Sequence, residues 1–150
     1  MQLLTADLWD CDGVLCLTTN GFVKNNGRAV MGAGVARQAV LRVPGIDKEL
    51  GRLIRRKGNI CQRIAGPGCN VEFDRSIVSF PVKVNWWEQA SLDLIRRSAE
   101  RLSEYLDHFI PGDCYLPKPG CGNGGLTWPE VADTLEPVLG RHNNLYIVDR

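Results

Sequence analysis

The chain has 150 residues, of which 44% are hydrophobic and 23% are charged, and its formal net charge is +1. This balance is typical of an ordinary globular protein, and the length suffices for one hydrophobic core, so we expect a single domain over residues 1–150. A charge this close to zero gives no reason to expect a membrane or nucleic-acid partner, and no apolar run approaches the roughly 20 residues of a membrane span.

The cysteines and the N-terminus indicate the compartment. No two cysteines form a CxxC pair, and neither histidine stands at a zinc-finger spacing from them, so we expect no metal and no cofactor. The segment "MQLLTADLWD" lacks the basic start and apolar core of a signal peptide. We therefore expect a cytoplasmic protein with free, mostly buried thiols. The six cysteines are Cys11, Cys16, Cys61, Cys69, Cys114 and Cys121.

The first third of the chain predicts two strands followed by two helices. "QLLTADLW" (2–9) and "GVLCLTT" (13–19) are short, apolar and separated by the turn-like "DCDG". Helical character follows in "GAGVARQAVLRV" (32–43) and in "GIDKELGRLIRRKG" (45–58), which is bounded by glycines. The basic clusters "RLIRRKGNICQR" and "LIRRSAER" are interpreted as solvated helix faces.

The middle of the chain predicts two more strands, 60–66 and 76–82, and then the clearest helix, 87–109. Apolar residues recur along this helix at steps of three and four, so they should form one buried stripe. His108 and His142 have no partner at a regular spacing, and we expect both on the surface. The stripe consists of Leu92, Ile95, Ala99, Leu102, Leu106 and Phe109.

The last third predicts a strand over 114–120, a helix over 127–139 and a strand over 144–149. Thr127 is the expected N-cap of this helix, with Glu130 at the third position. The alternation of helix and strand favours an α/β layered domain with a mostly parallel or mixed sheet between helices. Ligands of such sheets bind beyond the carboxyl ends of the strands.

Two glycine-rich segments, "VMGAGVARQA" (30–39) and "GCGNGGLTWPE" (120–130), each stand between a strand and a helix N-terminus. Missing side chains let main-chain N–H groups approach a ligand, and the helix adds unpaired donors and the positive end of its dipole. Two such loops could hold both phosphates of a pyrophosphate. Loop glycines also serve simple turns, and neither loop matches the Walker or Rossmann pattern.

These segments resemble the macro domain family, which binds ADP-ribose. "TADLWD", "CLTTNG", "RAVMGAGVARQA", "SFPVK" and "PKPGCGNGGLTWPEV" occur in the order of that family and extend over residues 5–131. The resemblance implies a three-layer α/β fold, in which a central mixed sheet of about six strands lies between helices. It also implies ADP-ribose, or an ADP-ribosylated macromolecule, as the ligand.

Within this family, "MGAGVA", "FPVK" and "GCGNGGL-W" are most similar to a branch with two kinds of member. These are terminal ADP-ribose protein glycohydrolase and the antitoxins that remove ADP-ribose from thymidine in DNA. The branch implies a catalytic lysine at Lys83. The protein-directed enzyme also has an Asp in its phosphate loop, where this chain has Gly124. The DNA-directed antitoxins have Gly there.

The resemblance also implies the ligand contacts. Asp7 would accept a hydrogen bond from the adenine amine, with Leu8 beside it; the alternative for Asp7 is a cap carboxylate. Asn20 would bind the distal ribose or serve as a strand-end turn residue. Asn123 would contact the ligand or provide αL tolerance. The remaining backbone contacts are assigned to Gly32, Ala33, Gly34, Val35, Gly120, Cys121, Gly122, Gly124, Gly125 and Leu126.

Lys83 has two possible roles at the anomeric carbon of the distal ribose. It could attack that carbon and form a Schiff-base-like intermediate, or it could stabilise the departing group electrostatically. Trp86 and Trp87 could pack in the core or at its rim, or stack on a group attached to ADP-ribose. Cys121 is expected to be a small packing residue. The carboxylates that could replace the missing acid are Glu88, Asp74 and Glu72.

Three functions therefore compete. The first is a glycohydrolase that removes ADP-ribose from a DNA base or a protein acidic residue by means of Lys83. The second is a non-catalytic reader of ADP-ribose, which the glycine at position 124 favours. The third is a phosphatase of ADP-ribose 1″-phosphate. We expect a monomer whose partner is ADP-ribose or an ADP-ribosylated DNA or protein, without a membrane partner.

Overall fold

Within residues 1–109 and 112–149, which the computed structural model describes, six strands form one sheet in the order β1-β6-β5-β2-β4-β3. Strand β3 pairs antiparallel with β4, and the other neighbours pair parallel, so the sheet is mixed as predicted. The strands are β1 (Gln2–Thr5), β2 (Val14–Asn20), β3 (Gln62–Ala65), β4 (Ile77–Lys83), β5 (Cys114–Pro117) and β6 (Leu145–Asp149).

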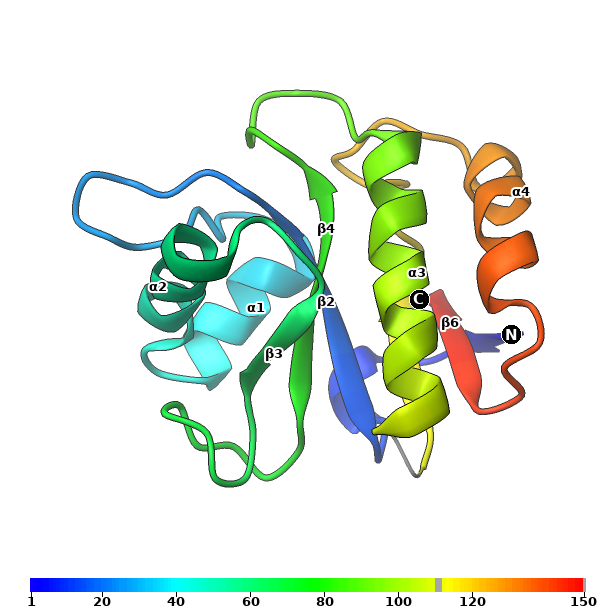
Figure 1. The fold of residues 1–150 in the computed structure, drawn as a ribbon, viewed down its shortest axis with the longest axis horizontal. Helices are drawn as coiled ribbons and strands as arrows, with labels where there is room; N and C mark the ends of the chain where they lie inside the picture. Colours follow the sequence, from blue (N-terminus) through cyan, green and yellow to red (C-terminus); the bar gives the residue numbers. More distant parts are fainter. Residues whose placement is uncertain (110–111, 150) are drawn as a thin grey trace.

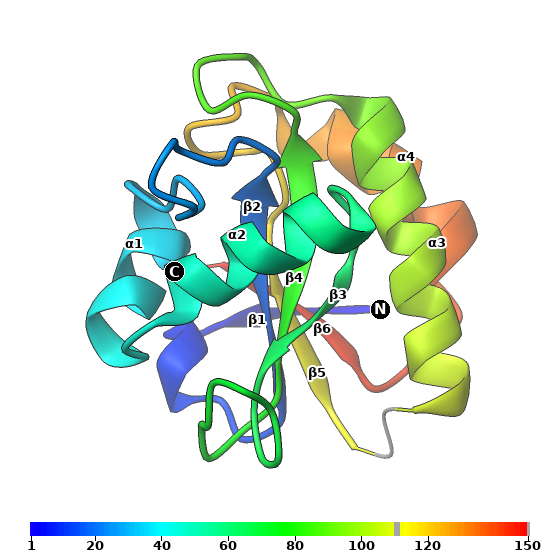
Figure 2. The same cartoon turned by 60° about the vertical axis from the view of Figure 1, so that its left-hand side comes forward.

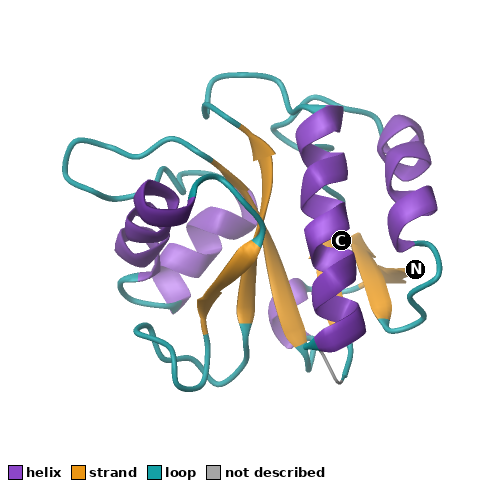
Figure 3. Cartoon of the chain, viewed as in Figure 1, coloured by secondary structure: helices purple, strands orange, loops and turns teal. Residues whose placement is uncertain are grey.

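Helices cover both faces of this sheet (Figures 1 and 3). Helices α1 (Gly34–Arg42) and α2 (Ile46–Lys57) pack on one face, and α3 (Leu92–His108) and α4 (Trp128–Leu139) pack on the other. Side chains of a strand alternate between faces, so Leu15 and Leu17 join the core under α1 and α2, whereas Cys16 joins the core under α3 and α4. The three-layer α/β prediction is confirmed.

Capping side chains set two boundaries that differ from those predicted. The Ser91 hydroxyl accepts a hydrogen bond from the amide of Leu94 (3.2 Å), so α3 begins at Leu92 and residues 87–91 form a loop. Strand β1 ends at Thr5, because Asp7 caps the short 3₁₀ helix η1 (Leu8–Asp10). At α4 the predicted capping box is present.

Two predicted surface assignments are wrong. Phe109, assigned to the buried stripe, follows the last residue of α3 and is 74% exposed. His142 was expected on the surface but is buried, and its Nε2 lies 2.8 Å from the hydroxyl oxygen of Ser103 in α3. This pair joins α3 to the turn before β6, a contact between residues far apart in the chain.

The pairing of β2 with β4 is irregular near their carboxyl ends. Thr19 lies opposite Pro81, but the next residue, Asn20, lies opposite Lys83. Pro81 has no amide hydrogen for a ladder, and proline in a strand is tolerated at such irregularities. The irregularity brings Asn20 and Lys83 side by side at the end of the sheet where the loops after β2, β4 and β5 gather (Figures 1 and 2).

The thiols are free, as predicted: four of the six cysteines are buried and two are partly buried. Among the described residues, no group of three or more His, Cys, Asp or Glu side chains could hold a metal ion. No helix of the described ranges is long and apolar enough to cross a bilayer.

The buried histidine generates a pH prediction. Burial, and then the nearby Arg141, lower the pKa of His142, although Asp107 opposes the shift. The unfolded chain takes up a proton near the ordinary pKa of about 6.5, whereas the folded chain does so only at lower pH. We therefore expect the free energy of unfolding to fall as the pH drops from 7.5 to 5.5, measured by urea denaturation.

The matched variants are His142→Gln and His108→Gln. His108 is exposed at the end of α3, so His108→Gln should keep the pH dependence of the wild type. His142→Gln should weaken that dependence. The same pH dependence in His142→Gln and wild type would contradict the assignment.

Candidate functional site

A cavity of about 1010 Å³ opens at the carboxyl ends of β2, β4 and β5. Both glycine loops line it, together with the ends of these strands and part of the loop between β4 and α3. Most of the predicted site residues therefore converge on one space. Those that line it are Asn20, Gly32, Ala33, Gly34, Val35, Lys83, Gly120, Gly122, Asn123 and Gly124.

The other predicted residues do not line this cavity. Leu8 and Leu126 are buried in the two cores, and Cys121 packs against the core under α3 and α4. Gly125 closes the second glycine loop through its amide, which donates to the carbonyl of Gly122 (3.2 Å). Asp7 accepts a hydrogen bond from the amide of Trp9 (3.0 Å), so it acts as a cap carboxylate; its contact with adenine stays a prediction.

The glycine loops present free main-chain donors. Among the described residues, no acceptor faces the amides of Gly32 and Ala33, which lead into α1. In the second loop the amide of Leu126 donates to the carbonyl of Gly120 (2.9 Å), whereas the amides of Gly122 and Asn123 have no acceptor in the described ranges. Such donors at the start of helices favour a bound anion.

The second loop is held by a close approach of its own backbone. Gly120 has a φ of +75°, which favours glycine. A Cβ at Gly124 would lie 2.4 Å from the carbonyl oxygen of Gly120 and 2.8 Å from the Cβ of Ala90. At the position where the resemblance has an Asp, this loop therefore has no room for a side chain.

Lys83 is fixed at both its backbone and its side chain. Its Nζ donates to the carbonyl of Asn123 (3.2 Å) and to that of Trp86 (3.3 Å). Its own carbonyl accepts from the amide of Gly21 (3.1 Å) and from Nδ2 of Asn59 (3.0 Å). The amine is thus held between the loop after β4 and the second glycine loop. The supporting role of Asn59 was not predicted, because Asn59 lies outside every motif.

The two asparagines differ in role. Asn20 donates through Nδ2 to the carbonyl of Val30 (3.0 Å) and accepts at Oδ1 from the amide of Phe22 (3.0 Å), so it shapes the turn as well as lining the cavity. Each group retains one further proton or lone pair for a ligand. No described residue other than glycine has a positive φ, which excludes the αL interpretation of Asn123.

One of the three candidate carboxylates lies at this site. Glu88 is the single carboxylate among the described residues that line the cavity, and its Oε1 accepts from the amide of Asn85 (2.7 Å). Asp74 instead pairs with Arg75 (3.2 Å), and Glu72 lines a different cavity. Burial raises the pKa of the Cys121 thiol, which agrees with a packing role rather than a thiolate nucleophile.

Sequence reasoning missed Lys118, which lines the cavity beside the second glycine loop. Its Nζ lies 2.9 Å from Oδ2 of Asp149 and 5.2 Å from the ring centroid of Trp128. The signal was present, since Lys118 stands two residues before Gly120 in "PKPG". Thr19 was also missed: its buried hydroxyl has no hydrogen-bond partner among the described residues, and the residue lines the cavity.

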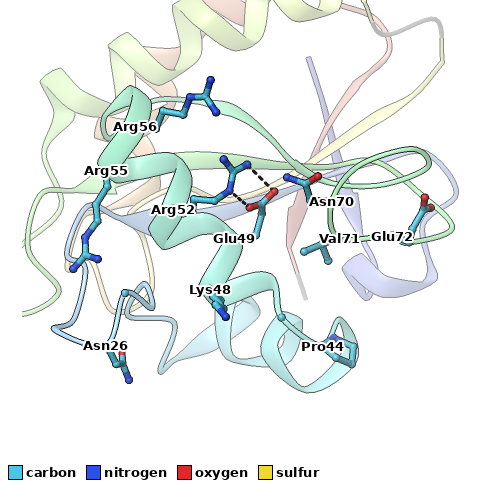
Figure 4. A pocket seen from close by; sticks show the side chains of 12 residues that line it. Asn26, Pro44, Lys48, Glu49, Arg52, Arg55, Arg56, Asn70, Val71 and Glu72 are labelled. Carbon is cyan, nitrogen blue, oxygen red and sulfur yellow. Dashed lines mark hydrogen bonds and ion pairs between the residues drawn. The ribbon is translucent and has the colours of Figure 1, made fainter.

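A second cavity, of about 850 Å³, lies beside α2 (Figure 4). An ion pair between Arg52 and Glu49 occupies its centre, with Nε of Arg52 2.5 Å from Oε1 of Glu49. Hydrogen bonds from Arg52 hold the pKa of Glu49 below its usual value. Neither glycine loop reaches this cavity. We therefore assign the ligand site to the larger cavity, which both glycine loops line.

Known proteins share this fold. The macrodomain of Thermus aquaticus DarG aligns with a TM-score of 0.78 at 23% identity, over 99% of this chain and 97% of that one. The macrodomain of Mycobacterium tuberculosis DarG aligns with a TM-score of 0.73 at 23% identity, over 98% and 95% of the two chains. Thermosipho africanus DarTG in complex with ADP-ribose aligns with a TM-score of 0.73 at 19% identity, over 91% of this chain and 37% of that one.

A curated relative, the DNA ADP-ribosyl glycohydrolase of Thermus aquaticus, is 29% identical over 118 residues. The match covers 76% of this chain and 32% of the relative, so the chain spans about a third of that protein's length. No protein-family model matches the chain. The structural matches show that the chain has the macrodomain fold.

The close packing at Gly124 generates a prediction. Gly124→Ala forces a Cβ against the carbonyl of Gly120, and we expect it to lower the free energy of unfolding by about 1–3 kcal/mol. Gly122→Ala is the matched control, because no atom lies within 4 Å of its added Cβ. Urea denaturation compares the two variants. Equal stability would contradict the packing argument.

Proposed function

We propose that this chain binds ADP-ribose between its two glycine loops and hydrolyses the bond that joins the distal ribose to a modified macromolecule. The modified group is a base of DNA or an acidic residue of a protein. The observation that carries the proposal is the amine of Lys83, which is held between two loops on the wall of the cavity. The name of the curated relative supports the same activity.

The order of strands supports one orientation of the ligand. Asp7 follows β1, the glycine loops adjoin α1 and β5, and Asn20 and Lys83 end β2 and β4. In the sheet order, β1 and β4 are four strand spacings apart, or about 19 Å. An ADP-ribose laid along this edge would have adenine near Asp7, the pyrophosphate between the glycine loops and the distal ribose beside Lys83.

The charges around the cavity suit such a ligand. Lys83 and Lys118 line it together with the free amides of both loops, and Lys118 is also paired with Asp149 (2.9 Å). Glu88 is the single carboxylate among the described lining residues. Amide donors that are already oriented bind a pyrophosphate without further ordering of the chain. Binding therefore does not depend on an acid at position 124.

Cleavage requires a group that acts on the anomeric carbon, and we assign it to Lys83. Attack requires the unprotonated form of the amine, which has two N–H groups for these two hydrogen bonds and one lone pair for the carbon. The amine attacks the anomeric carbon while the bond to the macromolecule breaks; the leaving group keeps the electron pair and takes a proton. The ribose ring opens to an imine with Lys83, and water hydrolyses the imine to release ADP-ribose.

The free thiols further support a reducing cytoplasm as the location. We further propose that the protein is a monomer with one domain over residues 1–150. Gel filtration with light scattering tests the oligomeric state.

Lys83→Ala separates binding from cleavage. We expect wild type and variant to bind ADP-ribose with affinities within about threefold in calorimetry, because the amides remain. Hydrolysis of ADP-ribosylated thymidine DNA or acidic peptide should fall at least roughly 100-fold in the variant. Lys48→Ala, at an exposed lysine beside the second cavity, is the control. Binding without cleavage by the wild type would identify a reader, and no binding at millimolar ADP-ribose would end the proposal.

The nucleophilic role of Lys83 has a separate test. Cyanoborohydride reduces an imine to a stable amine, so adding it during turnover should attach ADP-ribose to Lys83, detected by peptide mass spectrometry. The adduct should be absent in Lys83→Ala. Undiminished turnover without any adduct would assign Lys83 the electrostatic role instead.

A further inference from the structure

The loop between β4 and α3 exposes large apolar side chains beside the cavity. Val84, Trp86 and Trp87 are 58%, 52% and 59% exposed, and both tryptophans line the cavity. Exposing two adjacent tryptophans forgoes the stabilisation that their burial would bring. A contiguous patch of this kind marks a binding surface. Neither tryptophan belongs to a core cluster, so packing at the rim and stacking on an attached group are the predicted roles that stay open.

Phe22, from the loop after β2, joins the two tryptophans in one cluster, which we call the aromatic platform. The rings of Trp86 and Trp87 meet edge to face, with centroids 5.5 Å apart and planes at 90°. Phe22 and Trp87 meet with centroids 5.5 Å apart and planes at 67°. Edge contacts leave ring faces uncovered, which agrees with the large exposed fraction of both tryptophans.

The backbone beneath the platform is fixed. The amide of Asn85 donates to Oε1 of Glu88 (2.7 Å), and the amide of Glu88 donates to the carbonyl of Asn85 (3.2 Å). The carbonyl of Trp86 accepts from Nζ of Lys83 (3.3 Å). The backbone that carries the rings is therefore ordered before any partner binds, which lowers the entropic cost of binding.

Two cationic side chains belong to, or contact, the loop that carries Phe22. Lys24 lies two residues after Phe22, and Nη2 of Arg55 donates to the carbonyl of Lys24 (3.0 Å). Figure 4 shows Arg55 extending from α2 toward the loop that contains Asn26. In the described part of the chain, neither Lys24 nor Arg55 forms an ion pair with a carboxylate. Glu88 is the acidic group nearest in sequence to the tryptophans, and one of its oxygens is occupied by Asn85.

We propose that the aromatic platform stacks on the bases of single-stranded DNA whose modified nucleotide has its ADP-ribose in the cavity, while Lys24 and Arg55 bind neighbouring phosphates. Open ring faces beside unpaired cations match unstacked bases on a polyanionic backbone. A duplex would keep its bases stacked on each other, and a peptide would give the cations no regular anionic partner. The inference rests on the proposed function, since the ADP-ribose cavity fixes where the strand begins.

The kinetic test compares two substrates with the same scissile bond: an ADP-ribosylated single-stranded oligonucleotide and ADP-ribosylated thymidine without flanking nucleotides. Stacking by one aromatic residue is worth roughly 5- to 150-fold in affinity. Trp87→Ala should lower kcat/KM for the oligonucleotide by a factor in this range, and the oligonucleotide-to-nucleoside ratio should fall correspondingly. Trp87→Phe should recover part of the loss.

The control is Phe109→Ala, which removes an exposed aromatic side chain at the opposite end of α3 from the platform. It should leave both substrates unaffected. Equal losses on the two substrates in Trp87→Ala, or no loss on either, would overturn the proposal. So would a loss confined to an ADP-ribosylated peptide, which would identify a protein partner.

A second measurement does not need catalysis. Unmodified single-stranded oligonucleotide should quench the tryptophan fluorescence of the wild type but much less that of the Trp86→Ala, Trp87→Ala double variant. Lys24→Gln combined with Arg55→Gln should reduce the slope of log K against log salt by about 1.4, since each phosphate contact to a single strand contributes about 0.7. An unchanged slope or quenching would overturn the platform. Failure of the proposed function is distinct: the wild type would then neither bind ADP-ribose nor cleave either substrate.

Discussion

Pro81 has no amide hydrogen to offer, and at this residue the pairing of β2 with β4 shifts, so that Asn20 faces Lys83. The site depends on this local constraint. At the shifted strand end, the carbonyl of Lys83 accepts hydrogen bonds from Gly21 and Asn59. With its backbone held in this way, Lys83 extends its side chain toward the second glycine loop. The position of the amine is thus set by the backbone of two central strands together with the two loop carbonyls that accept its hydrogen bonds.

The rest of the site combines rigid supports with unsatisfied donors. Hydrogen bonds close the second glycine loop on itself and tie it to the segment before α3 through the amide of Ala90, which donates to the carbonyl of Gly124 (2.9 Å). Other amides at the same place have no acceptor among the described residues. A tightly ordered loop with unpaired main-chain donors favours a bound anion. The unpaired amides lower the stability of the loop, but they are already oriented for a ligand.

Local patterns in the sequence predicted much of this. The glycine loops, the strand ending in Lys83 and the cap at Thr127 are contiguous signals whose physical causes lie within a few residues. What escaped prediction depended on distant partners. His142 is buried against Ser103, which lies 39 residues away in the sequence. Glu88 could not be chosen over Asp74 or Glu72, because the three differ only in where the fold takes them. Trp86 and Trp87 are exposed because Ser91 caps α3, so the helix begins at Leu92 and both tryptophans lie in the loop before it.

The crowding at Gly124 limits which residues this position accepts, including the aspartate that stands here in one of the two kinds of phosphate loop that the segment resembles. A carboxylate at this position first needs the carbonyl of Gly120 and the methyl group of Ala90 to move away, since both lie within 2.8 Å of where a Cβ would be. A Gly124→Asp substitution therefore meets a steric barrier. In this chain, such a side chain would require accompanying shifts around positions 90 and 120. The loop whose Asn123 carbonyl accepts the hydrogen bond of Lys83 therefore resists substitution at position 124.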